Sequence, residues 1–333
     1  MTQTELSQVF NEFAAQSQKD HPQLNDELLV LDSDNGTFHG SFSRKKKYTF
    51  ISNEDFAASL KRAADDIAQY GSHANKISFT MNGVPGVRAG SLIAYSHERD
   101  SQRLMGGDHP ELYAMMFTLY HELGHHVVKD SMYTGETDEG RNFSETAADI
   151  YALIRMRQKF PDEQPGLFEA YVSVGRIISL AEWGHTSHYT NFAIDKLREV
   201  SRTVDLQALT PQQSAELAWN IAAQNTVPAP VQFRIKEDFR AFRDEVTKDR
   251  PTAMQNLAEK VLAADNTFFR AGMHYFTPLF IGIAAIPDVD FSTDWWKDMG
   301  KKLLTRARDI AIDGVGAGLP KLQQPPNIQN ITP

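Results

Sequence analysis

The segment His121-Glu122-Leu123-Gly124-His125 has the residue types and the spacing of a zinc site on a helix. Residues four apart on an α-helix lie on the same face, so one helix can present both imidazoles to one tetrahedral metal ion. Glu122 lies about 100° further round the helix, which places its carboxylate beside the metal. A carboxylate there is suited to take a proton from a zinc-activated water. We therefore predict a hydrolytic site with one Zn²⁺ per chain.

The residues around this segment predict a buried helix over 110–129. Asp108 is expected to be its N-cap, with Glu111 completing a capping box and Pro110 in the first turn. The segment is apolar on nearly all faces, which is typical of a helix with no solvent-facing side. Buried histidines need polar partners, and a metal ion would supply one to each. The alternative is a pair of core histidines that are hydrogen-bonded to backbone carbonyls.

A catalytic zinc ion takes three protein ligands and keeps one position open for water. A metzincin-type site would need Gly and His where this chain has Val128 and Ser131, so that solution is excluded. The other common solution is a glutamate from a second helix, and Glu145 offers it, with Asp149 four residues further on the same face. Glu145 could instead complete a capping box with Asn142. The other acidic residues in this region are Glu136, Asp138 and Glu139.

At this point the chain resembles the gluzincins, the thermolysin-like zinc peptidases. Nineteen residues separate His125 from Glu145, the spacing of that family. Residues 117–156 also show local similarity to regulatory metallopeptidases of the ImmA/IrrE type. The resemblance implies a zincin-like fold in which His121, His125 and Glu145 bind zinc. It also implies that Asp149 hydrogen-bonds a ligand histidine and fixes its tautomer.

Gluzincins usually supply a histidine or a tyrosine that stabilises the oxyanion of the reaction. The polar segment 184–190 lies between two apolar helices and contains His185, His188 and Tyr189. These three residues are the candidates for that role. An ordinary solvent-facing helix start is the alternative for the segment.

Composition limits the classes of partner. The chain has 333 residues and a formal net charge of −9, which argues against nucleic acid as the main partner. It has no cysteine, which excludes disulfides, thiolate catalysis and a cysteine-ligated zinc. The N-terminus lacks the features of a signal peptide, and the longest apolar run is too short for a membrane span. We expect a cytoplasmic protein, or one exported without a classical signal peptide.

Hydrophobic periodicity predicts an α+β fold with an N-terminal sheet part and a mainly helical C-terminal part. The expected organisation is an α/β part over 1–130 that includes the zinc-binding helix, a helical part over 131–318 that carries the third ligand, and a disordered tail over 319–333. Strands are expected at 28–32, 37–42, 48–52, 77–81 and 92–96, and helices at 1–20, 56–70, 110–129, 143–159, 166–182, 188–201, 212–224, 234–247, 252–272 and 293–312.

A sheet directly before the zinc-binding helix could hold an extended peptide along its edge. The segment 91–96 is the candidate edge strand, and an ordinary core strand is the alternative.

These features predict a zinc metallopeptidase that acts on a peptide or protein substrate, with Glu122 as general base. One alternative is a zincin-fold regulatory or binding protein with little proteolysis. Another is a zinc hydrolase that acts on a non-peptide amide.

Overall fold

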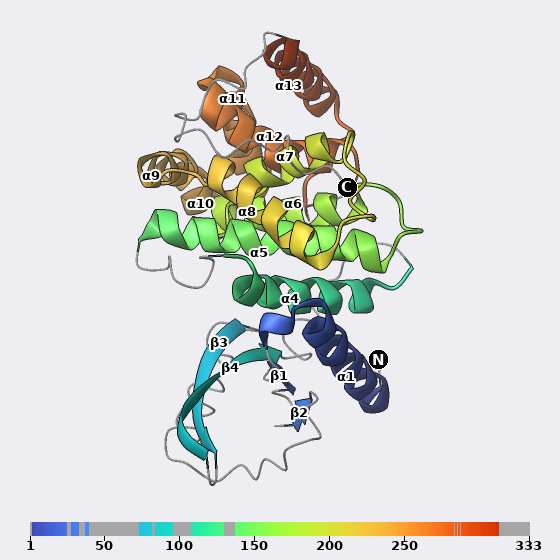
Figure 1. The fold of residues 1–333 in the computed structure, drawn as a ribbon. Coiled ribbons are helices and arrows are strands. Elements are labelled where there is room, and N and C mark those ends of the chain that lie inside the picture. Colours follow the sequence, from blue (N-terminus) through green and yellow to red (C-terminus); the bar gives the residue numbers. More distant parts are fainter. Residues whose placement is uncertain are drawn as a thin grey trace. The chain divides into compact units, whose positions relative to one another are not determined.

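A computed structural model describes most of the chain (Figure 1). The described residues are 2–24, 28–32, 37–39, 73–81, 84–95, 108–129, 137–282, 284, 286 and 288–312. The predicted strand 48–52, helix 56–70 and tail 319–333 lie outside them.

Helices make up most of the described residues. The first, α1 (Gln3–Asp20), begins with a capping box in which Thr2 and Glu5 exchange hydrogen bonds. A short 3₁₀ turn, η1 (Pro22–Leu24), follows it. The later helices are α4 (Pro110–Val127), α5 (Asp138–Lys159), α6 (Leu167–Trp183), α7 (Asn191–Val200), α8 (Pro211–Asn225), α9 (Ala229–Asp238), α10 (Arg240–Val246), α11 (Arg250–Ala263), α12 (Asn266–Phe280) and α13 (Asp294–Ile312).

The strands form one small sheet in the order β2-β1-β4-β3. β1 (Leu28–Asp32) pairs antiparallel with β2 (Thr37–His39) and parallel with β4 (Val84–Tyr95). β3 (His73–Met81) pairs antiparallel with the other side of β4. The segment 91–95 therefore has a neighbouring strand on each side. The interpretation of 91–96 as a free edge is wrong, and the alternative of an interior strand is confirmed.

The chain divides into two compact units that interleave in sequence. The first consists of Met1–Met132, Tyr151–Glu163 and Asp205–Ala218, and the second of Tyr133–Ile150, Gln164–Val204 and Trp219–Pro333. The sequence-based division at residue 130 treats the helical part as one continuous piece, whereas segments 151–163 and 205–218 group with the N-terminal residues.

Contacts of α1 with β4 and α4, and of α5 with α8, hold the first unit together. Phe10 and Phe13 of α1 make edge-on ring contacts with Tyr95 of β4 and Tyr120 of α4. The start of α8 is tied to α5 by Gln158, whose Nε2 donates to the Leu206 and Leu209 carbonyls and to Ser214. The carbonyl groups of this irregular turn thereby receive a hydrogen bond from the Gln158 side chain instead of from water.

The core of the second unit is built from apolar faces of α6, α7 and α9–α13. Its aromatic side chains pack edge to face, as in the contact of Phe239 with Phe268 at 5.0 Å between ring centroids. Gly272 of α12 lies against Val261 of α11, and a Cβ at position 272 would overlap both γ-methyl groups of that valine. Glycine is therefore required for the close approach of these two helices.

The predicted α+β class is wrong, because the described residues are predominantly helical, with one small sheet near the N-terminus. Among the described side chains, the strands contribute only Leu28, Val30, Ile93 and Tyr95 to the buried apolar set. Helices supply most of the rest of that set. Periodicity identified the strand segments but not the predominance of helix among the described residues.

Two predicted helices are divided in the structure. The predicted helix 252–272 breaks after Ala263, because Asp265 accepts hydrogen bonds from the amides of Thr267 and Phe268 and so starts α12. The predicted helix 234–247 is divided at Phe239 into α9 and α10.

We expect Gly272→Ala to lower the free energy of unfolding by about 1–3 kcal/mol, because the added methyl group must push α11 and α12 apart. Urea unfolding followed by circular dichroism measures the change. Gly175→Ala in α6 is the matched control, since a Cβ there meets no atom within 4 Å. Its effect should lie within about 1 kcal/mol and favour the folded state. Equal effects of the two substitutions would contradict the close approach at Gly272.

Candidate metal centre

Helix α4 carries the zinc motif and is buried over most of its length. Pro110 occupies its first turn, as expected. The predicted cap is wrong: His109 is the N-cap residue, and it makes no side-chain capping bond. The helix does not depend on this cap, since burial of its apolar side chains stabilises it.

His121, Glu122 and His125 meet at one place on α4. Their ligand atoms all lie within 4.8 Å of one another. His121 and Glu122 are buried, with 7% and 5% of their surfaces exposed, and His125 is half-buried. The two imidazole rings are nearly perpendicular, and their Nε2 atoms are 3.3 Å apart. The three side chains thus form a compact donor set on one helix.

The distance between the two Nε2 atoms provides a test of metal binding. Zinc binds imidazole nitrogen at about 2.0–2.1 Å, so two such ligands at the tetrahedral angle lie about 3.3–3.4 Å apart. The spacing of 3.3 Å therefore fits a zinc ion. A neutral imidazole has one acceptor nitrogen, and both histidines direct Nε2 to the same place. The donor set is chemically suited to zinc, for which imidazole is a preferred ligand.

The predicted third ligand, Glu145, lies on α5. This helix begins at Asp138, so Asn142 is inside it and the capping-box interpretation of Glu145 is wrong. Of the other acids considered, Asp138 is exposed and forms an ion pair with Arg141 at 2.5 Å. Glu139 is in the same first turn, and Glu136 lies outside the described residues.

Glu145 is held by His188. The Nδ1 atom of His188 is 2.9 Å from a carboxylate oxygen of Glu145 and 3.3 Å from the Arg176 guanidinium. A single Nδ1 cannot donate to Glu145 and accept from Arg176 at once, and the shorter contact favours donation to Glu145. This contact orients the Glu145 carboxylate.

Asp149 of α5 carries a buried negative charge in the second unit, which also contains Glu145 and His188. Its side chain is completely buried, and Arg176 of α6 contacts both of its oxygens, at 2.5 and 2.8 Å. Thr190 donates a further hydrogen bond at 2.6 Å. This is the bidentate geometry in which arginine binds carboxylates most strongly. Asp149 therefore connects α5 to α6 and to the start of α7.

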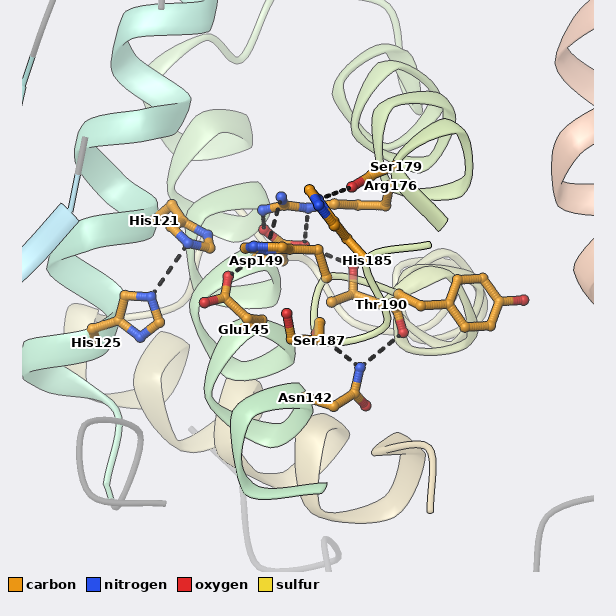
Figure 2. A network of polar contacts seen from close by, with 12 residues as sticks. His121, His125, Asn142, Glu145, Asp149, Arg176, Ser179, His185, Ser187 and Thr190 are labelled. Carbon is orange, nitrogen blue, oxygen red and sulfur yellow. Dashed lines mark hydrogen bonds and ion pairs between the residues drawn. The ribbon is translucent and has the colours of Figure 1, made fainter. Parts of the chain in front are cut away.

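Asn142 joins α5 to the segment that carries the predicted oxyanion helpers. Its amide nitrogen donates to the carbonyls of Ser187 and Tyr189, at 2.9 and 3.1 Å, and its oxygen accepts from the Val227 amide at 2.8 Å (Figure 2). The side chain is fully buried. It satisfies backbone groups of an irregular turn that have no helical partners.

The other two helper candidates are placed differently from His188. His185 is exposed, and its Nδ1 is 3.4 Å from the Ser179 hydroxyl. Partial burial of the ring and the charges of His188 and Lys236 lower the pKa of His185. Tyr189 is fully buried, and its hydroxyl contacts His274 Nδ1 at 3.0 Å. Burial raises the pKa of Tyr189 well above its usual range.

The candidate residues thus fall into two groups, each within one unit. His121, Glu122 and His125 belong to the first unit, and Glu145, Asp149, His185, His188 and Tyr189 to the second.

Sequence reasoning missed Asn142 as an anchor and Arg176 altogether. Arg176 is the one basic residue of α6, whose other side chains are mostly apolar. A lone arginine in an apolar helix is a recognisable signal of a buried carboxylate partner. Asn142 gave a weaker signal, because asparagine is common at helix starts and its position inside α5 could not be read from its type.

Comparisons with models of protein families, with characterised protein sequences and with solved structures returned no match to this chain.

We expect Arg176→Leu to lower the free energy of unfolding by about 3–5 kcal/mol, because it leaves the Asp149 charge buried without its partner. The double variant Arg176→Leu/Asp149→Leu removes both charges and should recover much of the loss. Urea unfolding of the two single variants and the double variant measures the coupling. Additive losses in the double variant would show that the pair does not act as a unit.

Proposed function

We propose that the protein is a zinc-dependent metallopeptidase of the gluzincin type. The observation that carries the proposal is the 3.3 Å separation of His121 Nε2 and His125 Nε2, with the Glu122 carboxylate within 4.8 Å of both rings' nitrogen ligands. Two imidazoles at the ligand spacing of zinc support metal binding, and an adjacent buried carboxylate supports hydrolysis. A purely structural zinc site would have no use for such a base.

A zinc ion held by these residues would lower the pKa of a bound water and polarise the scissile carbonyl. Glu122 accepts the proton of the attacking water and passes it to the leaving amine. Its place on α4, one residue from His121, fixes it next to the reaction.

Glu145 is the proposed third ligand, on the spacing of the sequence and on its close contact with His188, whose Nδ1 lies 2.9 Å from a carboxylate oxygen. A neighbouring side chain that restricts the carboxylate supports a fixed ligand direction, as metal sites require. The proposed contact of Asp149 with a ligand histidine stays a prediction. Its bonds to Arg176 and Thr190 support a second role, which is to hold α5 in place.

His188 is the helper residue that the contacts favour. When both ring nitrogens carry protons, Nδ1 donates to Glu145 and Nε2 is a second donor that can stabilise an oxyanion. His185 is exposed, and Tyr189 would have to give up its bond to His274, so both are weaker candidates.

The proposed substrate is a peptide or a protein. Among the described residues, no helix combines the length and the apolar character that crossing a bilayer requires.

The purified protein is expected to retain about one zinc ion per chain, and Glu145→Ala should weaken zinc affinity. Loss of a ligand should cost more than the roughly 10–100-fold that follows loss of a residue that only orients a ligand. Competition with a chromogenic chelator measures the affinity, and His121→Ala serves as the positive reference. Asp138→Ala and Glu139→Ala are the controls, since they remove nearby carboxylates of the same helix. Wild-type affinity in Glu145→Ala would assign the third ligand elsewhere.

Glu122→Gln is expected to keep the zinc ion and the fold but to lower kcat by roughly 10²–10⁴-fold, because the amide cannot accept the proton of the attacking water. Cleavage of a mixed peptide library, read by mass spectrometry, identifies a substrate on which kcat is then measured. Glu111→Gln is the matched control, because it makes the same exchange in the first turn of the same helix. Turnover at the wild-type rate by Glu122→Gln would rule out Glu122 as the base. Zinc binding without cleavage of any library peptide would instead favour a regulatory protein or a hydrolase of another amide.

A further inference from the structure

A pocket of about 470 Å³ lies between α6, α7, α12 and α13, all of which belong to the second unit. Its volume is within the range of sites that hold small organic ligands, about 300–1,000 Å³. None of the proposed metal ligands, the proposed base or the helper candidates lines it. Its wall combines charged side chains from α7 and α12 with apolar side chains from α12 and α13.

Positive charge exceeds negative charge in this wall. Arg198 and Arg270 contribute two cationic groups, and Asp195 contributes one carboxylate. Asp195 already forms an ion pair with Arg198 at 3.0 Å. None of the ion pairs recorded among the described residues includes Arg270, whose guanidinium lies 4.6 Å from the centre of the Phe192 ring. The ring holds Arg270 in place by a cation–π contact without neutralising it.

A partly buried series of hydrogen bonds orders the polar end of the pocket. The Tyr189 hydroxyl contacts His274 Nδ1 at 3.0 Å, and His274 Nε2 contacts Asp195 at 2.7 Å. A neutral imidazole satisfies both contacts, with Nδ1 accepting from tyrosine and Nε2 donating to the carboxylate. These two hydrogen bonds occupy both ring nitrogens of His274 and one carboxylate oxygen of Asp195. Arg270 is left as the group that can bind an incoming anion.

The wall becomes apolar along α12. Arg270 and Ile281 are eleven residues apart, which is about 16 Å along the helix axis. Met273 and Pro278 line the wall between them, and Ile310 of α13 faces the same space. Ile281 is 60% exposed, a large apolar side chain left in contact with water at the end of this face. A ligand that covered it would gain the free energy of burying apolar surface.

We propose that this pocket binds a single-headed amphipathic anion, a monocarboxylate with an unbranched apolar chain. The carboxylate pairs with Arg270 over Phe192, and the chain extends along α12 toward Ile281. One net positive charge in the wall matches one negative charge on the ligand, and the length of the apolar face matches a linear chain.

The full-length protein is titrated by calorimetry with hexanoate, heptanoate, octanoate and nonanoate, each below its micelle concentration. We expect one site per chain and an affinity that rises about three- to fourfold with each methylene group. Octanol should bind at least about tenfold more weakly than octanoate, because it lacks the charge that Arg270 pairs with. Octyl phosphate tests whether the head-group requirement is for a carboxylate or for any anion, and binding tighter than that of octanoate would overturn the carboxylate assignment.

Arg270→Gln is expected to weaken octanoate binding by roughly 10–100-fold, since a charged hydrogen bond is lost. Arg308→Gln is the matched control: it removes the same charge from an exposed site on α13 that does not line the pocket, and should change affinity less than twofold. Ile281→Ser tests the apolar end at an exposed position, so the fold is not at risk, and should reduce the gain per methylene group.

Several results would overturn the proposal. Equal affinity of Arg270→Gln and the wild type, with the fold verified by circular dichroism, would remove Arg270 as the anion partner. Equal affinity for octanol and octanoate, or no saturable binding by any member of the series, would remove the site. These measurements involve no turnover, so their failure would leave the proposed peptidase function unaffected.

Discussion

A carboxylate that is fully withdrawn from water costs several kcal/mol unless charges and hydrogen bonds replace its hydration. Asp149 is such a group, and Arg176 and Thr190 provide that replacement. Because these partners come from α6 and from the start of α7, the carboxylate can be satisfied only when three segments have the correct arrangement. The turn between α6 and α7, with His188, is thereby held against α5 and Glu145. Asn142 secures the same turn from a neighbouring position of the helix.

The juxtaposition of His121 and His125 was the part of the candidate site most readily predicted from sequence. His121 and His125 are four residues apart on a helix that the apolar pattern also predicted, and the geometry of a helix then determines their common face. Burial of the helix was predicted for the same reason. Its cap was not, because Asp108 matched the preferred residue type although His109 occupies the capping position.

The partners of the second group could not be predicted in the same way. The contacts of Asp149 with Arg176 and of Tyr189 with His274 join residues 27 and 85 positions apart, and no local pattern links them. The α+β class failed for a related reason. The alternation of apolar and polar residues identified strands. Whether strands or helices supply the core depends on packing between distant segments, which the periodicity of a sequence does not encode. The break before α12 was local and its signal, Asp265, was present, but the apolar pattern on both sides concealed it.

Helix α5 has a further property that concerns how the protein opens. From Thr146 to Ile154 every side chain is completely buried, so this stretch has no exposed face. Backbone amides in such a segment exchange with solvent only when the surrounding structure unfolds, so their opening free energy approaches that of the whole fold. Glu145 directly precedes the stretch and Asp149 lies within it. The polar residues of α5 are thus carried by a backbone that does not fray, and their positions persist through the local fluctuations that displace residues on surface loops.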